Sequence, residues 1–190
     1  PPELKVHEML RFTGHARLPK HTAYSEVSRK VGNVIRVLGM EDVKYDIIGN
    51  ANQSGLNRNQ RIFLGLAVEL MSEPHALFIE EELIDSMPLV KSVQLMHCLQ
   101  QIAKSGVTVV MIADRPRYDL FKMADDVLLL GRHHGIAYSG PTKSCLQYFT
   151  ELDFKISPHY NPPDFFIDVV DGNVEKPGDP NFNTDKLLHY

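Results

Sequence analysis

The sequence predicts an α/β domain with a mainly parallel sheet. Two short apolar runs, Ala76–Ile79 and Val107–Ala113, are typical of strands that are covered on both faces. Longer segments with helical periodicity lie around these runs, so that helix and strand alternate as they do in βαβ units. A chain of 190 residues is long enough to form one such domain with a sizeable core.

The remaining elements follow from apolar periodicity and from capping residues. The apolar residues of Ser25–Leu38 recur at helical spacing, and Asn57 is a good N-cap for a helix that runs to Met71. A third strand, Asp126–Leu130, is expected to return as a hairpin through Ile136–Tyr138. Further helices are expected at Val90–Lys104, Pro116–Met123, Thr142–Leu152 and from Asn161 to about Gly172.

The composition is that of an ordinary globular domain. Hydrophobic residues make up 43% of the chain and charged residues 23%, which excludes wholesale disorder. The 20 Lys and Arg against 24 Asp and Glu give a net charge of −4, so no nucleic-acid partner is expected. The two cysteines, Cys98 and Cys145, are too few and too far apart for a disulfide framework or a zinc site.

Charged residues follow two of the predicted strands directly. Glu80 and Glu81 come after Ile79, and Asp114 comes after Ala113. The carboxyl ends of parallel strands are where α/β domains place their chemistry, and acidic residues there can hold hydrated Mg²⁺ and orient a water. A solvated acidic turn is the alternative, because glutamate runs are common in loops.

The order of these segments resembles the nucleotide-binding domain of an ABC transporter of the G (white/pleiotropic-drug-resistance) type. The resemblance covers about residues 4–172, and the final helix segment is similar to the half-size members of plants and protists. Its most specific parts are Asn161-Pro162-Pro163-Asp164 and the Asp126–Leu130 strand with its hairpin. The other matching segments are Leu4–Leu10, which resembles the segment after the family's Q-loop, Gly55–Arg61, Glu73–Glu81 and Thr108–Pro116.

The resemblance implies a P-loop NTPase-like (RecA-type) parallel sheet with an ABC helical subdomain. The helical subdomain would occupy roughly residues 20–72 and the core roughly 73–172, with 173–190 as a linker toward a membrane domain outside this chain. The chain begins at Pro1 without an initiator Met and contains no G-x-x-x-x-G-K-[ST], so we expect a piece of a longer protein that lacks the Walker A strand.

The resemblance also assigns candidate site residues. Glu80 takes the place of the Walker B acid that holds Mg²⁺ through water, and Glu81 matches the general base that polarises the attacking water. Asp114 stands at the position of the family's switch histidine. The ABC signature, Ser-Gly-Gly-Gln-Arg in the family, is replaced by Asn57, Arg58, Asn59, Gln60 and Arg61, of which only the last two match.

Two of these departures weaken the expected site. Arg58 and Asn59 replace glycines that let the backbone approach the γ-phosphate, although Arg58 could contact a phosphate as a cation. An ionised Asp114 cannot donate a hydrogen bond there, and a charge ~4 Å from a phosphate charge repels it by about 4 kcal/mol at an effective dielectric of 20. That repulsion corresponds to a loss of about three decades in the rate of hydrolysis. Mg²⁺ or Arg115 could offset part of the repulsion.

The function implied by the resemblance is the coupling of ATP binding and hydrolysis to the export of lipids or hydrophobic compounds. The intact parent would use ATP and Mg²⁺, with neither expected to bind tightly to this fragment. Its partners would be a second nucleotide-binding domain, identical or not, and the transmembrane domain of the same transporter, at the cytoplasmic face of a membrane. We expect a degenerate half with weak or no hydrolysis; the alternative is a non-catalytic regulatory or interaction module derived from an ABC domain.

Overall fold

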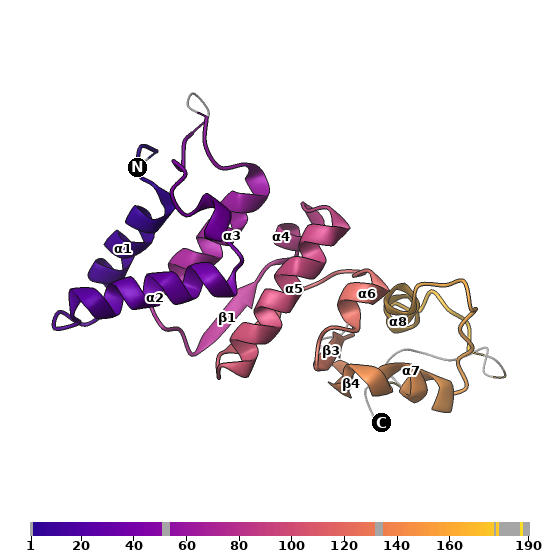
Figure 1. The fold of residues 1–190 in the computed structure, drawn as a ribbon. Helices are drawn as coiled ribbons and strands as arrows, with labels where there is room; N and C mark the ends of the chain where they lie inside the picture. Colours follow the sequence, from indigo (N-terminus) through magenta and orange to yellow (C-terminus); the bar gives the residue numbers. More distant parts are fainter. Residues whose placement is uncertain (1, 51–53, 132–134, 177, 179–186, 188–190) are drawn as a thin grey trace. The chain divides into compact units, whose positions relative to one another are not determined.

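The computed structural model describes residues 2–50, 54–131, 135–176, 178 and 187 (Figure 1). The chain forms two compact units, Pro1–Ile112 and Ala113–Tyr190, hereafter unit 1 and unit 2. The predicted division at residues 72/73 and the predicted linker at 173–190 differ from this boundary and remain predictions. None of the helices in the described part of the chain is both long and apolar enough to cross a membrane.

Unit 1 begins with a group of packed helices. They are α1 (Val6–Arg17), α2 (Tyr24–Val37), the 3-10 turn η1 (Glu41–Val43) and α3 (Arg58–Leu70). The helices expected at Ser25–Leu38 and after Asn57 are thereby confirmed, whereas α1 was not foreseen. α1 lies close to its neighbours at Gly14, where an added Cβ would come within 2.8 Å of both Met71 and Val27.

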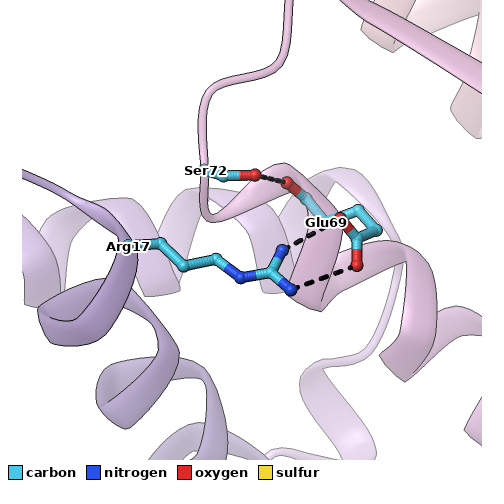
Figure 2. Close-up of polar contacts among 3 residues, drawn as sticks. All are labelled: Arg17, Glu69 and Ser72. Carbon is cyan, nitrogen blue, oxygen red and sulfur yellow. Dashed lines mark hydrogen bonds and ion pairs between the residues drawn. The ribbon is translucent and has the colours of Figure 1, made fainter.

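A polar contact on the surface joins α1 to α3. The guanidinium of Arg17, at the end of α1, donates to both carboxylate oxygens of Glu69, over 2.9 and 3.4 Å (Figure 2). The hydroxyl of Ser72 donates to the backbone carbonyl of Glu69 over 2.6 Å at the end of the same helix. Because both charged side chains are substantially exposed, this pair orients the helices more than it stabilises them.

The sheet of unit 1 is a parallel pair of strands. β1 (Ala76–Ile79) and β2 (Thr108–Met111) pair in register, and α4 (Glu81–Asp85) and α5 (Leu89–Lys104) form the crossover between them. The prediction that both faces are covered is wrong. Leu77 and Ile79 are buried, whereas Phe78 and Ile112 are 76% and 65% exposed. Side chains alternate between the faces of a strand, and within unit 1 the described residues leave the face that carries Phe78 uncovered.

Unit 2 contains an antiparallel hairpin and three helices. They are α6 (Tyr118–Phe121), β3 (Asp126–Leu130), β4 (Ile136–Pro141), α7 (Thr142–Glu151) and α8 (Pro162–Val170). The hairpin and the helices agree with the sequence predictions. The expected mainly parallel sheet is corrected, because β3 pairs with β4 and the described residues hold one parallel pair and one antiparallel pair.

An aromatic cluster forms the core of unit 2. The rings of Phe149 and Phe166 stack with their centroids 5.0 Å apart and an interplanar angle of 11°, and Phe154 meets Phe149 edge-on. All three side chains are at most 2% exposed. Leu187 is also buried in this core, so part of the segment beyond residue 172 packs against unit 2.

Candidate functional site

The segment predicted to take the place of the ABC signature forms the start of α3. Asn57 is the N-cap: its side-chain oxygen accepts a hydrogen bond from the Gln60 amide over 2.9 Å. The Gln60 side chain returns the bond by accepting from the Asn57 amide over 2.8 Å, which completes a capping box. The predicted N-cap is therefore confirmed, and both polar side chains are engaged within the segment itself.

Arg61 holds the loop that leads into this helix. Its guanidinium donates to the backbone carbonyls of Leu56, Gly49 and Ile48 over 3.0, 3.2 and 2.8 Å. Gly55 lies against the same strip of backbone, since an added Cβ would stand 2.4 Å from the Ile48 oxygen. The side chain of Arg61 thus ties Ile48 and Gly49 to Leu56, a role that its place in a nucleotide-binding motif did not reveal.

The cap occupies one of the backbone amides at the start of α3. A helix N-terminus attracts anions through amides that have no partner inside the helix. Here the Asn57 side chain occupies the Gln60 amide, and the side chains of Arg58 and Asn59 stand at the first turn. The exposed guanidinium of Arg58 is the group in this segment that could still meet a phosphate, through its charge.

The strand-end glutamates lie in unit 1, directly after β1. Glu80 is exposed and serves as the N-cap position of α4, which begins at Glu81. The side chain of Glu81 lies outside what the structure describes. A single exposed carboxylate such as that of Glu80 suits a magnesium ion that keeps most of its water. Among the described residues, no group of three or more His, Cys, Asp or Glu could hold a metal ion directly.

Asp114 lies in unit 2, in the exposed loop that follows β2. Its neighbour Arg115 has a backbone φ of 47°, which few non-glycine residues adopt, and donates to Asp168 of α8 over 2.9 Å. Tyr160 donates to the other oxygen of Asp168 over 2.5 Å. These two donors, Tyr160 first and Arg115 second, hold the pKa of Asp168 below its usual value.

The structure therefore brings together some of the predicted site residues and leaves others apart. Asn57, Gln60 and Arg61 form one connected segment. Glu80 and Asp114 fall in different units, and their convergence remains a prediction. The sequence analysis missed Asp168 and Tyr160. Nothing in the spacing of the Asn-Pro-Pro-Asp segment indicates that Asp168, on the next helical turn, pairs with Arg115, which lies 53 positions earlier.

Solved structures give the class of the fold. The structure of cbiO1 from Clostridium perfringens, part of the ABC transporter complex cbiONQ, matches 79% of this chain with a TM-score of 0.61 and 17% identity. The match covers 56% of the cbiO1 chain. The chain therefore has an α/β fold similar to that of ABC ATPase domains.

Sequence relatives give the family. The chain is 32% identical over 185 residues to ABC transporter G family member 28 of Arabidopsis thaliana. This alignment covers 97% of the chain and 16% of the relative. It is 31% identical over 172 residues to the broad substrate specificity ATP-binding cassette transporter ABCG2 of Rattus norvegicus, spanning 90% of this chain and 26% of the relative. A family model described as ABC-2 type transporter matches residues 114–189.

The chain is a homologue of the ABC transporter G family and corresponds to part of the nucleotide-binding region of such a transporter. The predicted resemblance is confirmed. The chain spans about a sixth to a quarter of the length of these relatives, 16% and 26% respectively.

Proposed function

We propose that this chain is the C-terminal portion of a degenerate ATP-binding cassette. In the full-length protein it would sit at the cytoplasmic face of a membrane, pair with a second nucleotide-binding domain, and serve a transporter that exports lipids or hydrophobic compounds. ATP and Mg²⁺ would be bound by the assembled protein, with Glu80 near the metal and Glu81 as the general base. Hydrolysis at the site that this chain completes would be weak or absent.

The observation that carries the degeneracy is the start of α3. Asn57 and Gln60 cap the helix through reciprocal hydrogen bonds between side chain and backbone. In addition, Arg58 and Asn59 replace the glycines that would let a phosphate approach the backbone. Asp114 adds a negative charge where a relative would have a hydrogen-bond donor. Both changes act in the same direction, because each weakens the binding of the terminal phosphate of ATP.

A non-catalytic regulatory or interaction module remains the second candidate, and the same capped helix end favours it. The sequence that flanks this chain in its gene separates the two. An intact phosphate-binding loop upstream and about six apolar segments of ~20 residues downstream support the transporter. The absence of both features would support the interaction module.

The degenerate site is tested by restoring the missing donor. In the full-length protein, Asp114→His should raise ATP turnover by up to about a thousandfold, because it removes a repulsion of about 4 kcal/mol. Asp119→His is the matched control, since Asp119 is exposed in α6 and pairs with Lys122. Robust turnover by the unmodified protein that falls on Asp114→His would show that the carboxylate is used productively and that the proposal is wrong.

A further inference from the structure

The loop that follows β2 is tied at two consecutive residues to one segment of unit 2. At Arg115 the tie is the ion pair with Asp168, over 2.9 Å. At Pro116 the backbone carbonyl accepts a hydrogen bond from the side chain of Asn161 over 3.3 Å. Asn161 is the N-cap position of α8 and Asp168 lies on the same helix, so a single element holds the loop from both points.

The backbone of the loop needs such a support. Arg115 has a φ of 47°, in the left-handed region that disfavours side chains with a Cβ. Residues in this region persist where their surroundings fix them. Pro116 restricts the residue before it still further, and Arg117 follows directly as the N-cap position of α6. The loop is therefore bounded by rigid neighbours and closed by contacts with α8.

The carboxylate of Asp168 is fully engaged. One oxygen accepts from Arg115 and the other from the Tyr160 hydroxyl, and the Asp168 side chain is 15% exposed. A charge-assisted pair of this kind fixes direction as well as charge. As a result, the hydrogen bond of the Arg115 guanidinium goes to Asp168, whereas the charge of its neighbour Asp114 acts on the guanidinium electrostatically.

We propose that Asp168 is a positioning residue that locks the loop 114–117 and withholds Arg115 from the nucleotide phosphates. The role of α8 is then to hold the loop 114–117 in one conformation. The carboxylate of Asp114 lies on the same loop, one residue before Arg115. This inference rests on the proposed function for its meaning, but the lock itself can be measured without any nucleotide.

The lock is tested by hydrogen exchange and by limited trypsin digestion of the full-length protein. Asp168→Asn should make the amides of Arg115, Arg117 and Tyr118 exchange about tenfold faster, and should accelerate cleavage after Arg117 by a similar factor. The Arg115–Pro116 bond is not a trypsin site, and cleavage after Lys155, in an exposed loop, is the internal reference. Asp153→Asn, the same change at an exposed residue of unit 2 outside this cluster, should leave both rates unchanged. Unchanged exchange in Asp168→Asn would overturn the lock.

A charge swap separates positioning from general destabilisation. Arg115→Asp and Asp168→Arg should each open the loop, and the double variant should restore slow exchange, because the pair is reformed in reverse. A variant that merely unfolds unit 2 would not be rescued. Failure of the swap to recover any protection, with unit 2 still folded by circular dichroism, would contradict the proposal.

The charge argument is tested with a fluorescent ATP analogue and Mg²⁺. Asp168→Asn should tighten binding by about tenfold through the freed Arg115, and Arg115→Gln in the same background should abolish that gain. Tighter binding in Asp114→His but not in Asp168→Asn would overturn the withholding of Arg115. No binding in any variant would instead contradict the proposed function, while the exchange measurement would still decide the lock.

Discussion

The two units differ in how completely they bury their apolar side chains. Unit 2 closes an aromatic core in which Phe149, Phe154 and Phe166 are at most 2% exposed. Unit 1 buries one face of its parallel strand pair and exposes the other, with Phe78 at 76% and Ile112 at 65%. Unit 2 thus depends on apolar packing of its own, whereas the strand pair of unit 1 has an apolar face that the rest of unit 1 leaves uncovered.

The candidate site residues follow the same division. In unit 1 the signature segment is shaped by hydrogen bonds, those of the Asn57 cap and of the Arg61 guanidinium. In unit 2 the loop at Asp114 is fixed by Arg115 and Asp168 beside a packed core. Changes to the core should therefore cost the most stability, and changes to the polar contacts should cost less and act locally.

The largest effect should come from the core of unit 2. Phe166→Ala removes a side chain that is 1% exposed and should lower the free energy of unfolding by about 3–5 kcal/mol. Phe12→Ala is the control, because Phe12 is 66% exposed and should cost less than about 0.5 kcal/mol. Urea unfolding followed by circular dichroism measures both, and equal costs would contradict the division between the units.

The next effect should come from the loop before α3. Arg61→Met should cost about 2–3 kcal/mol, because three backbone carbonyls lose their donor. Arg29→Met is the matched control, since Arg29 is 75% exposed and its ion pair with Glu26 is 4.0 Å long. Faster hydrogen exchange at Leu56, whose amide bonds to the Ile48 carbonyl, would locate the effect in the loop. If Arg61→Met lowers the free energy of unfolding no more than the control does, Arg61 does not hold the loop before α3.

The cap of α3 should contribute less. Asn57→Ala should cost about 1 kcal/mol, whereas Asn57→Asp should be nearly neutral, because aspartate caps a helix as well as asparagine does. Urea unfolding of the two variants gives the comparison. If the two substitutions were equally costly, the side-chain oxygen would not be the group that matters.

The exposed face of β1 should affect association more than stability. Phe78→Ser should reduce self-association of residues 1–190 and change the free energy of unfolding little, because the Phe78 side chain is 76% exposed. Leu77→Ser, on the buried face, should instead destabilise unit 1. Sedimentation velocity over a range of concentrations measures the association. A chain that is monomeric, with or without Phe78, and that melts sharply and reversibly would contradict this prediction.

The smallest effect should be a pH dependence in unit 2. The pKa of Asp168 is lowered by its hydrogen bonds with Tyr160 and Arg115, so its contribution to stability is present above the unfolded pKa of about 3.9. That contribution is lost as the pH falls through the lower folded pKa. Asp164 and Asp114 also act on this cluster through their charges. Thermal unfolding between about pH 2 and 6 should show a loss in acid that Asp168→Asn lacks.

Much of the local structure could be predicted from the sequence, because local signals decide it. The cap at Asn57, the proline-rich start of α8 and the periodicity of α2 are each read from residues within a few positions of one another. The strands β1 and β3 were predicted with the bounds that they have in the structure, for the same reason.

What could not be predicted depends on contacts between distant residues. An apolar run indicates a strand but not how many of its faces are covered, which is why the exposure of Phe78 was missed. The bonds of Arg61 to Ile48 and of Arg115 to Asp168 join residues 13 and 53 positions apart. Residue type and spacing alone cannot show which of several possible partners a guanidinium selects.

Steady-state ATP turnover by the full-length protein, with and without Glu81→Gln, tests the degenerate cassette most directly. The proposal predicts turnover near background in the unmodified protein and little further loss on this substitution, because the signature helix and Asp114 already disfavour the terminal phosphate. Robust turnover that Glu81→Gln abolishes would contradict it.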